Sequence, residues 1–173
     1  MLGVVVILQL SFAAGSLSAR TGLRFSKDPT AYAAFKGWNA ETNGTLTFHF
    51  KTDNKNGFLV YEDDKGQCQH IYLSLAGGRL RLRLEMGCCD ATQILLVGHN
   101  LADGKWHKVT VQRNYKYTTI TVDSWTNSTE YKGRGAQTLG VQSDLFVGGM
   151  PWYKPFNDLS FPAIKYESIH FKR

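Results

Sequence analysis

The sequence contains very little that could form a helix. No segment longer than about three turns has its apolar residues at helical spacing. Low-complexity tracts, internal repeats and obvious linkers are missing too, and 173 residues are enough for one domain with a substantial core. The chain instead has short apolar or alternating runs, separated by Gly, Asn and Asp, at 46–51, 58–61, 94–97, 106–113, 118–123 and 145–149. This pattern predicts a single all-β sandwich or barrel.

Sequence signatures of catalysis and of structural metal sites are also missing. None of the five histidines has H-x-x-x-H spacing, Cys88-Cys89 is not C-x-x-C, and there is no nucleophile elbow, P-loop or dinucleotide-binding motif. The acidic cluster Glu62-Asp63-Asp64 leaves three interpretations: a solvated turn, oxygen ligands for calcium, or a glycosidase site that uses Glu62 or Asp64. Consecutive side chains point in different directions, which favours the solvated turn. We therefore predict that the protein is not an enzyme.

Acidic residues are scarce relative to basic ones. The 14 Asp and Glu residues oppose 20 Lys and Arg residues, which gives a net charge of +6 at pH 7. Such an excess favours acidic partners: sulfated or sialylated glycans, anionic lipid or nucleic acid.

Charge is absent from the first 18 residues, in which an apolar run is followed by small residues. This pattern predicts a signal peptide at residues 1–18 and a folded domain from residue 22 to residue 173, the alternative being an N-terminal core strand. Export makes the triplets that begin at Asn43 and Asn127 candidate N-glycosylation sites. It also argues against nucleic acid as a partner, since the chain has no stacking-aromatic motif either.

The most informative local pattern surrounds Gly77-Gly78. Apolar residues alternate with polar residues before this pair and with arginines after it. A tight turn with φ > 0 at both central residues favours Gly-Gly, so the pattern predicts a β-hairpin. In this register the facing pairs, all on one side of the hairpin, are Leu75 with Leu80, Leu73 with Leu82 and Ile71 with Leu84.

The other face of the predicted hairpin carries Arg79, Arg81 and Arg83, spaced about 7 Å apart along one strand. Forked guanidinium groups in a row could bind the sulfate or carboxylate groups of a linear glycan such as heparan sulfate. Lys105, Lys108 and Arg113 would extend the row if their strand lies nearby. The favoured interpretation is an ordinary solvent-exposed face, in which Tyr72 and Glu85 are partners of the arginines.

Three cysteines leave one thiol without an intramolecular partner in an exported protein. The hairpin register places Cys68 opposite Gly87. Cys88 would reach Cys68 through a small bulge, whereas Cys89 has the correct face parity but lies farther past the strand. Cys68–Cys88 is the favoured pairing and Cys68–Cys89 the alternative.

Several segments together resemble a laminin G (LNS) domain. They are the hairpin with its flanks, D-G-K-W-H-K-V at 103–109, T-I-T-V-D at 119–123 and L-F-V-G-G-M-P at 145–151. Among such domains the chain is most similar to the first laminin G domain of the α-neurexins, whose opening W-N-A corresponds to residues 38–40. The hairpin-end cysteines of that domain correspond to Cys68 and Cys88, which supports this pairing. The resemblance covers almost all of the exported chain.

The resemblance implies a two-sheet antiparallel jelly-roll sandwich, of the laminin G or concanavalin-like type, that binds proteins or glycans through loops at one rim. Many members bind calcium there, with an aspartate just before the first apolar residues of the hairpin. Gln69, a neutral amide, stands at that position. Backbone carbonyls near Met86 and around Gly140-Val141 do not replace the missing charge. We therefore predict no metal and no cofactor, with calcium as the alternative.

The C-terminal residues also depart from the family. Laminin G domains continue after an F-K-G-like turn into a closing strand, whereas this sequence ends S-I-H-F-K-R without the glycine. We expect the closing strand to be missing, the domain to be truncated and one sheet position to be unfilled.

The overall prediction is an extracellular protein-binding module of a neurexin-like adhesion protein. It would be secreted or displayed on the outer face of the plasma membrane, in a parent protein that is membrane-anchored. Its partners would be extracellular proteins or receptors. A heparan sulfate-binding module is the alternative, and a jelly-roll glycosidase is a remote one.

Overall fold

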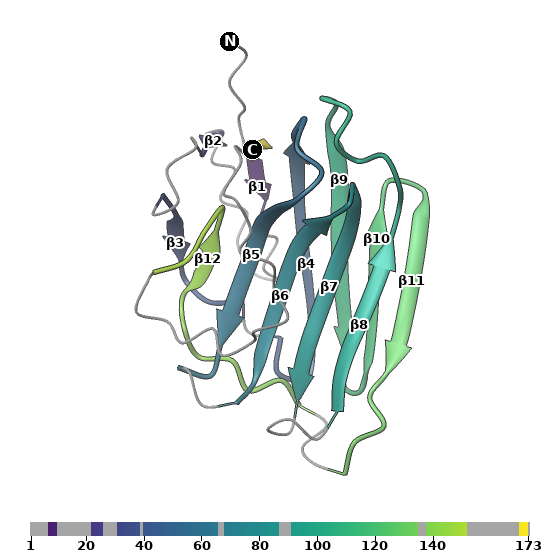
Figure 1. Cartoon of the computed structure of the whole chain (residues 1–173). Coiled ribbons are helices and arrows are strands. Elements are labelled where there is room, and N and C mark those ends of the chain that lie inside the picture. The colour runs from purple at the N-terminus through teal and green to yellow at the C-terminus, as the bar shows by residue number, and fades with distance from the viewer. Residues whose placement is uncertain are drawn as a thin grey trace.

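The computed structural model describes residues 7–9, 22–25, 31–38, 40–65, 68–86, 91–134, 138–151 and 170–172. Their strands form two antiparallel β-sheets that lie face to face (Figure 1). The described residues form no helix, and therefore no helix that could cross a membrane. The predicted all-β, two-sheet sandwich is confirmed.

The first sheet has the strand order β11-β10-β9-β4-β13-β2, and β1 also pairs with β4. Its central strands alternate between buried and accessible side chains, because one face of the sheet covers the core and the other meets solvent. The bounds are β1 (Ile7–Gln9), β2 (Leu23–Arg24), β4 (Asn43–Lys51), β9 (His107–Asn114), β10 (Tyr117–Val122), β11 (Trp125–Glu130) and β13 (His170–Lys172).

The second sheet has the strand order β3-β12-β5-β6-β7-β8. In contrast to the first sheet, β5 and most of β6 are buried on both faces. The bounds are β3 (Ala33–Phe35), β5 (Gly57–Asp63), β6 (His70–Ala76), β7 (Arg79–Met86), β8 (Ala91–Val97) and β12 (Leu145–Val147).

The predicted hairpin is formed by β6 and β7. Gly77 and Gly78 both have positive φ, 61° and 77°, as the tight turn requires. The three facing apolar pairs occur in the register that the alternation predicts. Their six side chains are at most 2% exposed and line the core opposite Leu46, Phe48 and Phe50 of β4.

Strands from near the two ends of the chain pair with the edge of β4 that faces away from β9. β13 pairs with Phe50 and Lys51, and β1 pairs with Thr47 and Phe48, while His49 is opposite both. The described strands thus occupy this edge of β4. The expected unfilled sheet position was not assigned to a particular strand and stays a prediction. Two other assignments stay predictions: residues 1–18 as a signal peptide, and the domain as truncated. Most of residues 1–21 and all of residues 152–169 lie outside the described residues.

Candidate functional site

Two connections that are far apart in the sequence meet at one end of the sandwich. The backbone carbonyl of Asp63, at the end of β5, accepts hydrogen bonds from the N–H groups of Gln142 (2.8 Å) and Ser143 (2.9 Å). The Ser143 hydroxyl in turn accepts a hydrogen bond from the Asp63 N–H at 3.0 Å. We call this end, formed by residues 63–65, 68–69 and 138–144, the rim. It corresponds to the loop-rich end that the sequence predicts as a binding surface.

Gln69 holds the centre of the rim. Its side-chain Oε1 accepts a hydrogen bond from the N–H of Gly140 at 2.7 Å, across 71 positions of sequence. Its backbone carbonyl accepts a second one from the N–H of Asp64 at 3.0 Å. Both carboxylate oxygens of Asp64 accept from the N–H of Cys68, at 2.9 and 3.0 Å. Asp63 Oδ1 likewise accepts from the N–H of Lys65 at 2.8 Å. Neutral groups therefore join the two rim loops, and two carboxylates accept hydrogen bonds within the first of them.

This donor set does not fit a calcium ion. Calcium prefers several oxygen ligands with anionic carboxylates among them. At the rim, Gln69 carries no charge and its Oε1 is already an acceptor for Gly140, while Asp64 caps its own loop. Over the described ranges, no group of three or more His, Cys, Asp or Glu side chains is arranged to hold a metal.

Glu62 is the residue that the sequence interpretation misplaced. We expected it in a solvated turn, but it is 1% exposed and lies on the core face of β5, opposite Ile71. Burial raises the pKa of Glu62 to about 8, although a hydrogen bond from the backbone of Trp38 opposes this rise, and the negative charges of Asp63 and Asp144 add to it. The carboxyl is therefore mostly protonated at neutral pH.

The structure argues against Glu62 and Asp64 as the two carboxyl groups of a glycosidase site. Glu62 is buried in the sandwich, out of reach of a sugar, and Asp64 is occupied by the N–H of Cys68. Inverting and retaining glycosidases both need two carboxyl groups that flank one accessible bond. The structure does not bring Glu62 and Asp64 together in this way.

The arginine row lies on the outer face of β7, as predicted, but its members are not equally accessible. Arg79 is exposed and its Nε donates to the carbonyl of Gly98 at 3.2 Å. The Arg83 side chain is only 17% exposed, and its Nη2 lies 3.6 Å from the Glu85 carboxylate. Tyr72 and Glu85, the expected solvent-exposed partners, are 1% and 2% exposed.

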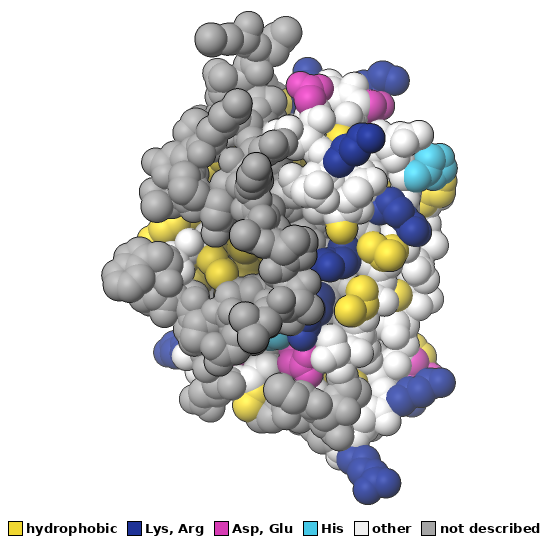
Figure 2. All heavy atoms as spheres, viewed as in Figure 1, with side chains coloured by type: hydrophobic (Ala, Val, Ile, Leu, Met, Phe, Trp, Pro, Cys, Tyr) yellow, Lys and Arg dark blue, Asp and Glu magenta, His cyan; other side chains and the backbone are white. Residues whose placement is uncertain are grey.

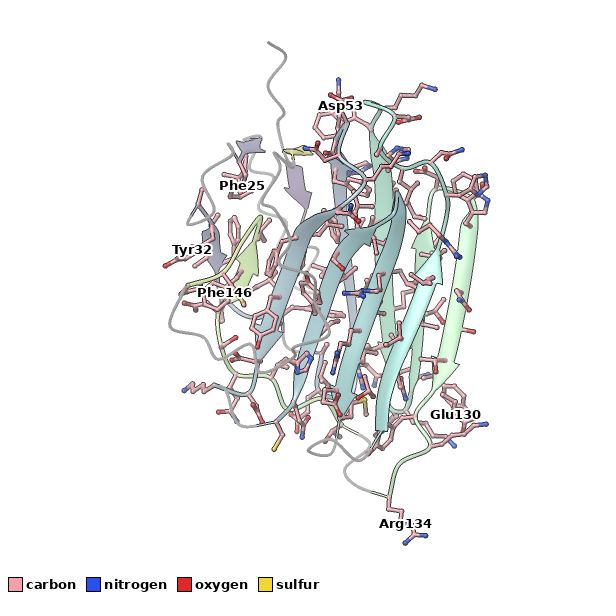
Figure 3. The ribbon with its side chains drawn as sticks, viewed as in Figure 1. Phe25, Tyr32, Asp53, Glu130, Arg134 and Phe146 are labelled. Carbon is pink, nitrogen blue, oxygen red and sulfur yellow. The ribbon has the colours of Figure 1, made fainter. Side chains whose placement is uncertain are left out.

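A second apolar cluster explains the burial of Tyr72. Phe58, Tyr61, Tyr72 and Phe146 pack together on the outer face of the second sheet, beside the row. Phe146 and Tyr32, which meet edge to face at 5.7 Å, mark its β12 and β3 side (Figure 3). The outer face of β5 and β6 is therefore not a plain solvent surface.

The proposed extension of the arginine row does not occur. Arg113 belongs to β9 of the other sheet and is 3% exposed. Its guanidinium donates to the Met86 sulfur at 3.3 Å and to the carbonyl of Tyr115 at 2.5 Å. Lys108 is exposed on the same strand β9 and therefore also belongs to the first sheet.

Both predicted glycosylation sites are exposed. Asn43 is the first residue of β4, and Asn127 lies in the middle of β11. The Asn127 Nδ2 donates to the carbonyl of Leu96 at 3.1 Å, which connects the edge strands of the two sheets. Cys68 is in a disulfide bond, but Cys88 and Cys89 lie outside the described residues, so the choice of partner stays a prediction.

The opposite end of the sandwich holds a charged network that the sequence analysis did not identify as a unit. His107 is 7% exposed, and its ring nitrogens lie 2.8 Å from Asp123 Oδ2 and 3.0 Å from Asp103 Oδ1. We call this end, which includes residues 52–56, 76–79, 98–106 and 122–125, the turn end. Asp53 marks it in Figure 3, where Glu130 and Arg134 mark the rim side. The D-G-K-W-H motif was the available signal, because it places Asp103 and His107 four positions apart.

The fold and these motifs define a laminin G domain. Residues 50–166 match the Laminin G domain family, and the chain belongs to this family. It is 36% identical over 168 residues to Neurexin 1 of Drosophila melanogaster and 34% identical over 163 residues to Neurexin-2 of Mus musculus. These alignments cover 95% and 94% of this chain but only 9% of each relative.

The solved structures agree on the fold. The mouse laminin alpha1 chain, domains LG4-5, superimposes with a TM-score of 0.76 at 20% identity, over 94% of this chain and 43% of that chain. Laminin G domains of this kind are in general extracellular binding modules without catalytic activity.

Proposed function

We propose that this domain is an extracellular protein-binding module of a neurexin-like adhesion protein and that its partner contacts the rim. The observation that carries the proposal is the pair of loops joined at Gln69 and Gly140. Hydrogen bonds fix the backbone of Gly140 and its neighbours, so exposed side chains such as Gln142 and Asp144 project from a backbone that is ordered before the partner binds. Such preorganisation lowers the conformational entropy lost on binding.

The same geometry supports calcium-independent recognition. In the proposed mechanism Gln69 joins the two rim loops directly, a role that would otherwise need an ion between them. No charged cation ligand is then required for the rim to keep its shape. We propose accordingly that the domain uses neither a metal nor another cofactor.

The remaining predictions about processing belong to this proposal. Residues 1–18 would be removed as a signal peptide, and β1, which lies within them, would then be absent from the edge of β4 in the mature protein. Asn43 and Asn127 would carry N-glycans, and Cys68 would pair with Cys88. The disulfide bond of Cys68 and the exposure of both asparagines support an extracellular location.

Heparan sulfate is the second candidate partner. The exposed Arg79 and the half-buried Arg81 and Arg83 on one strand favour it, together with the net charge of +6. Against it stand the ion pair of Arg83 with Glu85 and the low exposure of the Arg83 side chain. These contacts leave fewer free donors than the sequence suggests.

The test is the binding of the labelled, multimerised domain to cultured neurons. We expect binding to be lost after the cell surface is treated with trypsin and to survive heparinase. The double substitution Gln142→Arg and Asp144→Arg at the rim should weaken binding at least tenfold, whereas Lys55→Glu at the turn end should not change it. Binding that heparinase removes and that Arg79→Ala weakens would instead favour the glycan partner.

A further inference from the structure

The outer edge of β8 has no paired strand among the described residues, although β11 of the other sheet lies close to it. β8 is the last strand of its sheet in the part of the chain that the structure describes, so no described strand pairs with that edge. Its sequence, A-T-Q-I-L-L-V, has no charge and no proline. Ile94 and Leu96 are exposed by 57% and 37%, which is high for large apolar side chains. An exposed, uncharged and apolar edge of this kind favours pairing with other chains.

Apolar surface continues beyond β8. Trp125, on the neighbouring edge strand β11, is 38% exposed and lies with its ring 4.6 Å from that of His99. Figure 2 shows apolar side chains beside basic ones over β7 and β8. Charged residues within the edge strand itself, which commonly blunt such edges, are absent from β8.

The side chain of Asn127 contacts the outer edge of β8. Its Nδ2 lies 3.1 Å from the backbone oxygen of Leu96, so the atom that accepts an N-glycan is within hydrogen-bond distance of the exposed strand. Asn127 is itself exposed and begins the acceptor triplet Asn127-Ser128-Thr129. Asn43, the other acceptor, lies on β4, which is a central strand of the first sheet.

We propose that an N-glycan on Asn127 covers the β8 edge and keeps the domain from associating through it. This inference rests on the proposed extracellular location. In the transfer, Nδ2 bonds to the anomeric carbon of a lipid-diphosphate-linked oligosaccharide, the bond from that carbon to the diphosphate oxygen breaks, and Nδ2 loses one proton. The remaining N–H can still donate to Leu96, so the glycan is held over Ile94 and Leu96.

The experiment compares secreted variants made in a glycosylating host. Thr129→Ala removes the acceptor triplet but keeps the Asn127 side chain, so it separates the effect of the glycan from that of the hydrogen bond. Asn43→Gln is the matched control for the loss of one glycan elsewhere. Intact mass reports the occupancy of each site, and light scattering during gel filtration reports the molecular mass in solution.

We expect the wild type and Asn43→Gln to be monomeric and Thr129→Ala to at least double its apparent mass as concentration rises. Adding Ile94→Lys to Thr129→Ala should restore the monomer. Secreted protein without a glycan at Asn127 would overturn the inference and the predicted glycan at that site, while leaving the proposed partner binding at the rim intact. A monomeric Thr129→Ala would overturn the inference alone. Failure of the wild type to be secreted would instead contradict the extracellular location on which both rest.

Discussion

The two ends of the sandwich are fastened by different chemistry. At the turn end, a nearly buried His107 bridges Asp103 and Asp123, so charge-bearing groups hold the connections together. At the rim, the amide of Gln69 and backbone groups join the two loops, while the Asp63 and Asp64 carboxylates accept hydrogen bonds from N–H groups of their own loop. The contacts between connections therefore involve carboxylates and a histidine ring at the turn end, and neutral groups at the rim. We propose that a rim joined in this way needs no ion to keep its shape.

The difference between the two ends can be measured through two carboxyl groups, Asp103 at the turn end and Glu62 next to the rim, because their pKa values are shifted in opposite directions. Partial desolvation raises the pKa of Asp103, but hydrogen bonds from the N–H of Lys105 and from the His107 ring outweigh this effect and lower it. The stability that Asp103 contributes is present at neutral pH and is lost as pH falls through its lowered pKa. Burial instead raises the pKa of Glu62, next to the rim, to about 8.

The largest expected effect comes from Glu62. The folded state keeps its proton up to about pH 8, while the unfolded chain loses it near 4.5, so the free energy of unfolding should fall between these values as pH rises. Glu62→Gln should remove this dependence and stabilise the domain at pH 9 by roughly 3 kcal/mol. Urea unfolding of the wild type and of Glu62→Gln from pH 5 to pH 9 measures this dependence of the free energy of unfolding on pH.

The control for Glu62 is Asp53→Asn, which changes an exposed carboxyl at the turn end. It should leave the slope of stability against pH unchanged. If the wild type is equally stable at pH 5 and pH 9, the Glu62 carboxyl is not held protonated in the fold.

His107→Ala should have the next largest effect. It removes the bridge and leaves the Asp103 and Asp123 carboxylates without the ring that hydrogen-bonds to both, which should lower the free energy of unfolding by roughly 2 kcal/mol at pH 7. His99→Ala, at an exposed histidine whose ring lies tilted at 56° to that of Trp125, should lower the free energy of unfolding by less than about 1 kcal/mol. Equal losses for the two variants, measured by urea unfolding, would show that the bridge adds nothing.

Gln69→Leu should have a smaller effect on stability and a local one on structure. The substitution keeps the side-chain volume roughly constant but leaves the Gly140 N–H without its acceptor, at a cost of about 1–2 kcal/mol. Amide hydrogen exchange should become faster at residues 138–144 and stay unchanged at the turn end. Gln142→Leu, at an exposed rim position, is the control; the rim is not fastened by Gln69 if both variants exchange alike.

The hairpin could be predicted from the sequence because one turn and one alternation specify the same register. Glu62 could not, because a β-bulge between Phe58 and Val60 shifts the pairing of β5 by one residue. Without the bulge, strict alternation from Phe58 would place Glu62 on the outer face; with it, Leu59 and Val60 are both buried and Glu62 turns inward. Nothing local in the sequence identifies such a bulge.

The rim was predicted only in part. The family resemblance identified Gln69 as the unusual position and placed Gly140-Val141 beside it as a source of carbonyl oxygens. The direct hydrogen bond from the Gly140 N–H to the Gln69 side chain was not predicted, because its geometry depends on how the two loops fold. The burial of Tyr72 was missed for a similar reason, since Tyr72 packs in a cluster with Phe146 from β12, a strand much later in the chain. Glu85 lies between its strand partners His70 and Thr92 and accepts a hydrogen bond from the Thr92 hydroxyl.

The most direct test of the neutral rim is the melting temperature of the domain in excess calcium and in excess chelator. The wild type should melt at the same temperature in both, because Gln69 joins the rim loops without an ion. Gln69→Asp, which adds a carboxylate and shortens the reach toward Gly140, should melt lower in chelator and regain stability in calcium. A wild-type domain that calcium stabilises by several degrees, with the gain lost in chelator, would contradict the hydrogen-bonded rim.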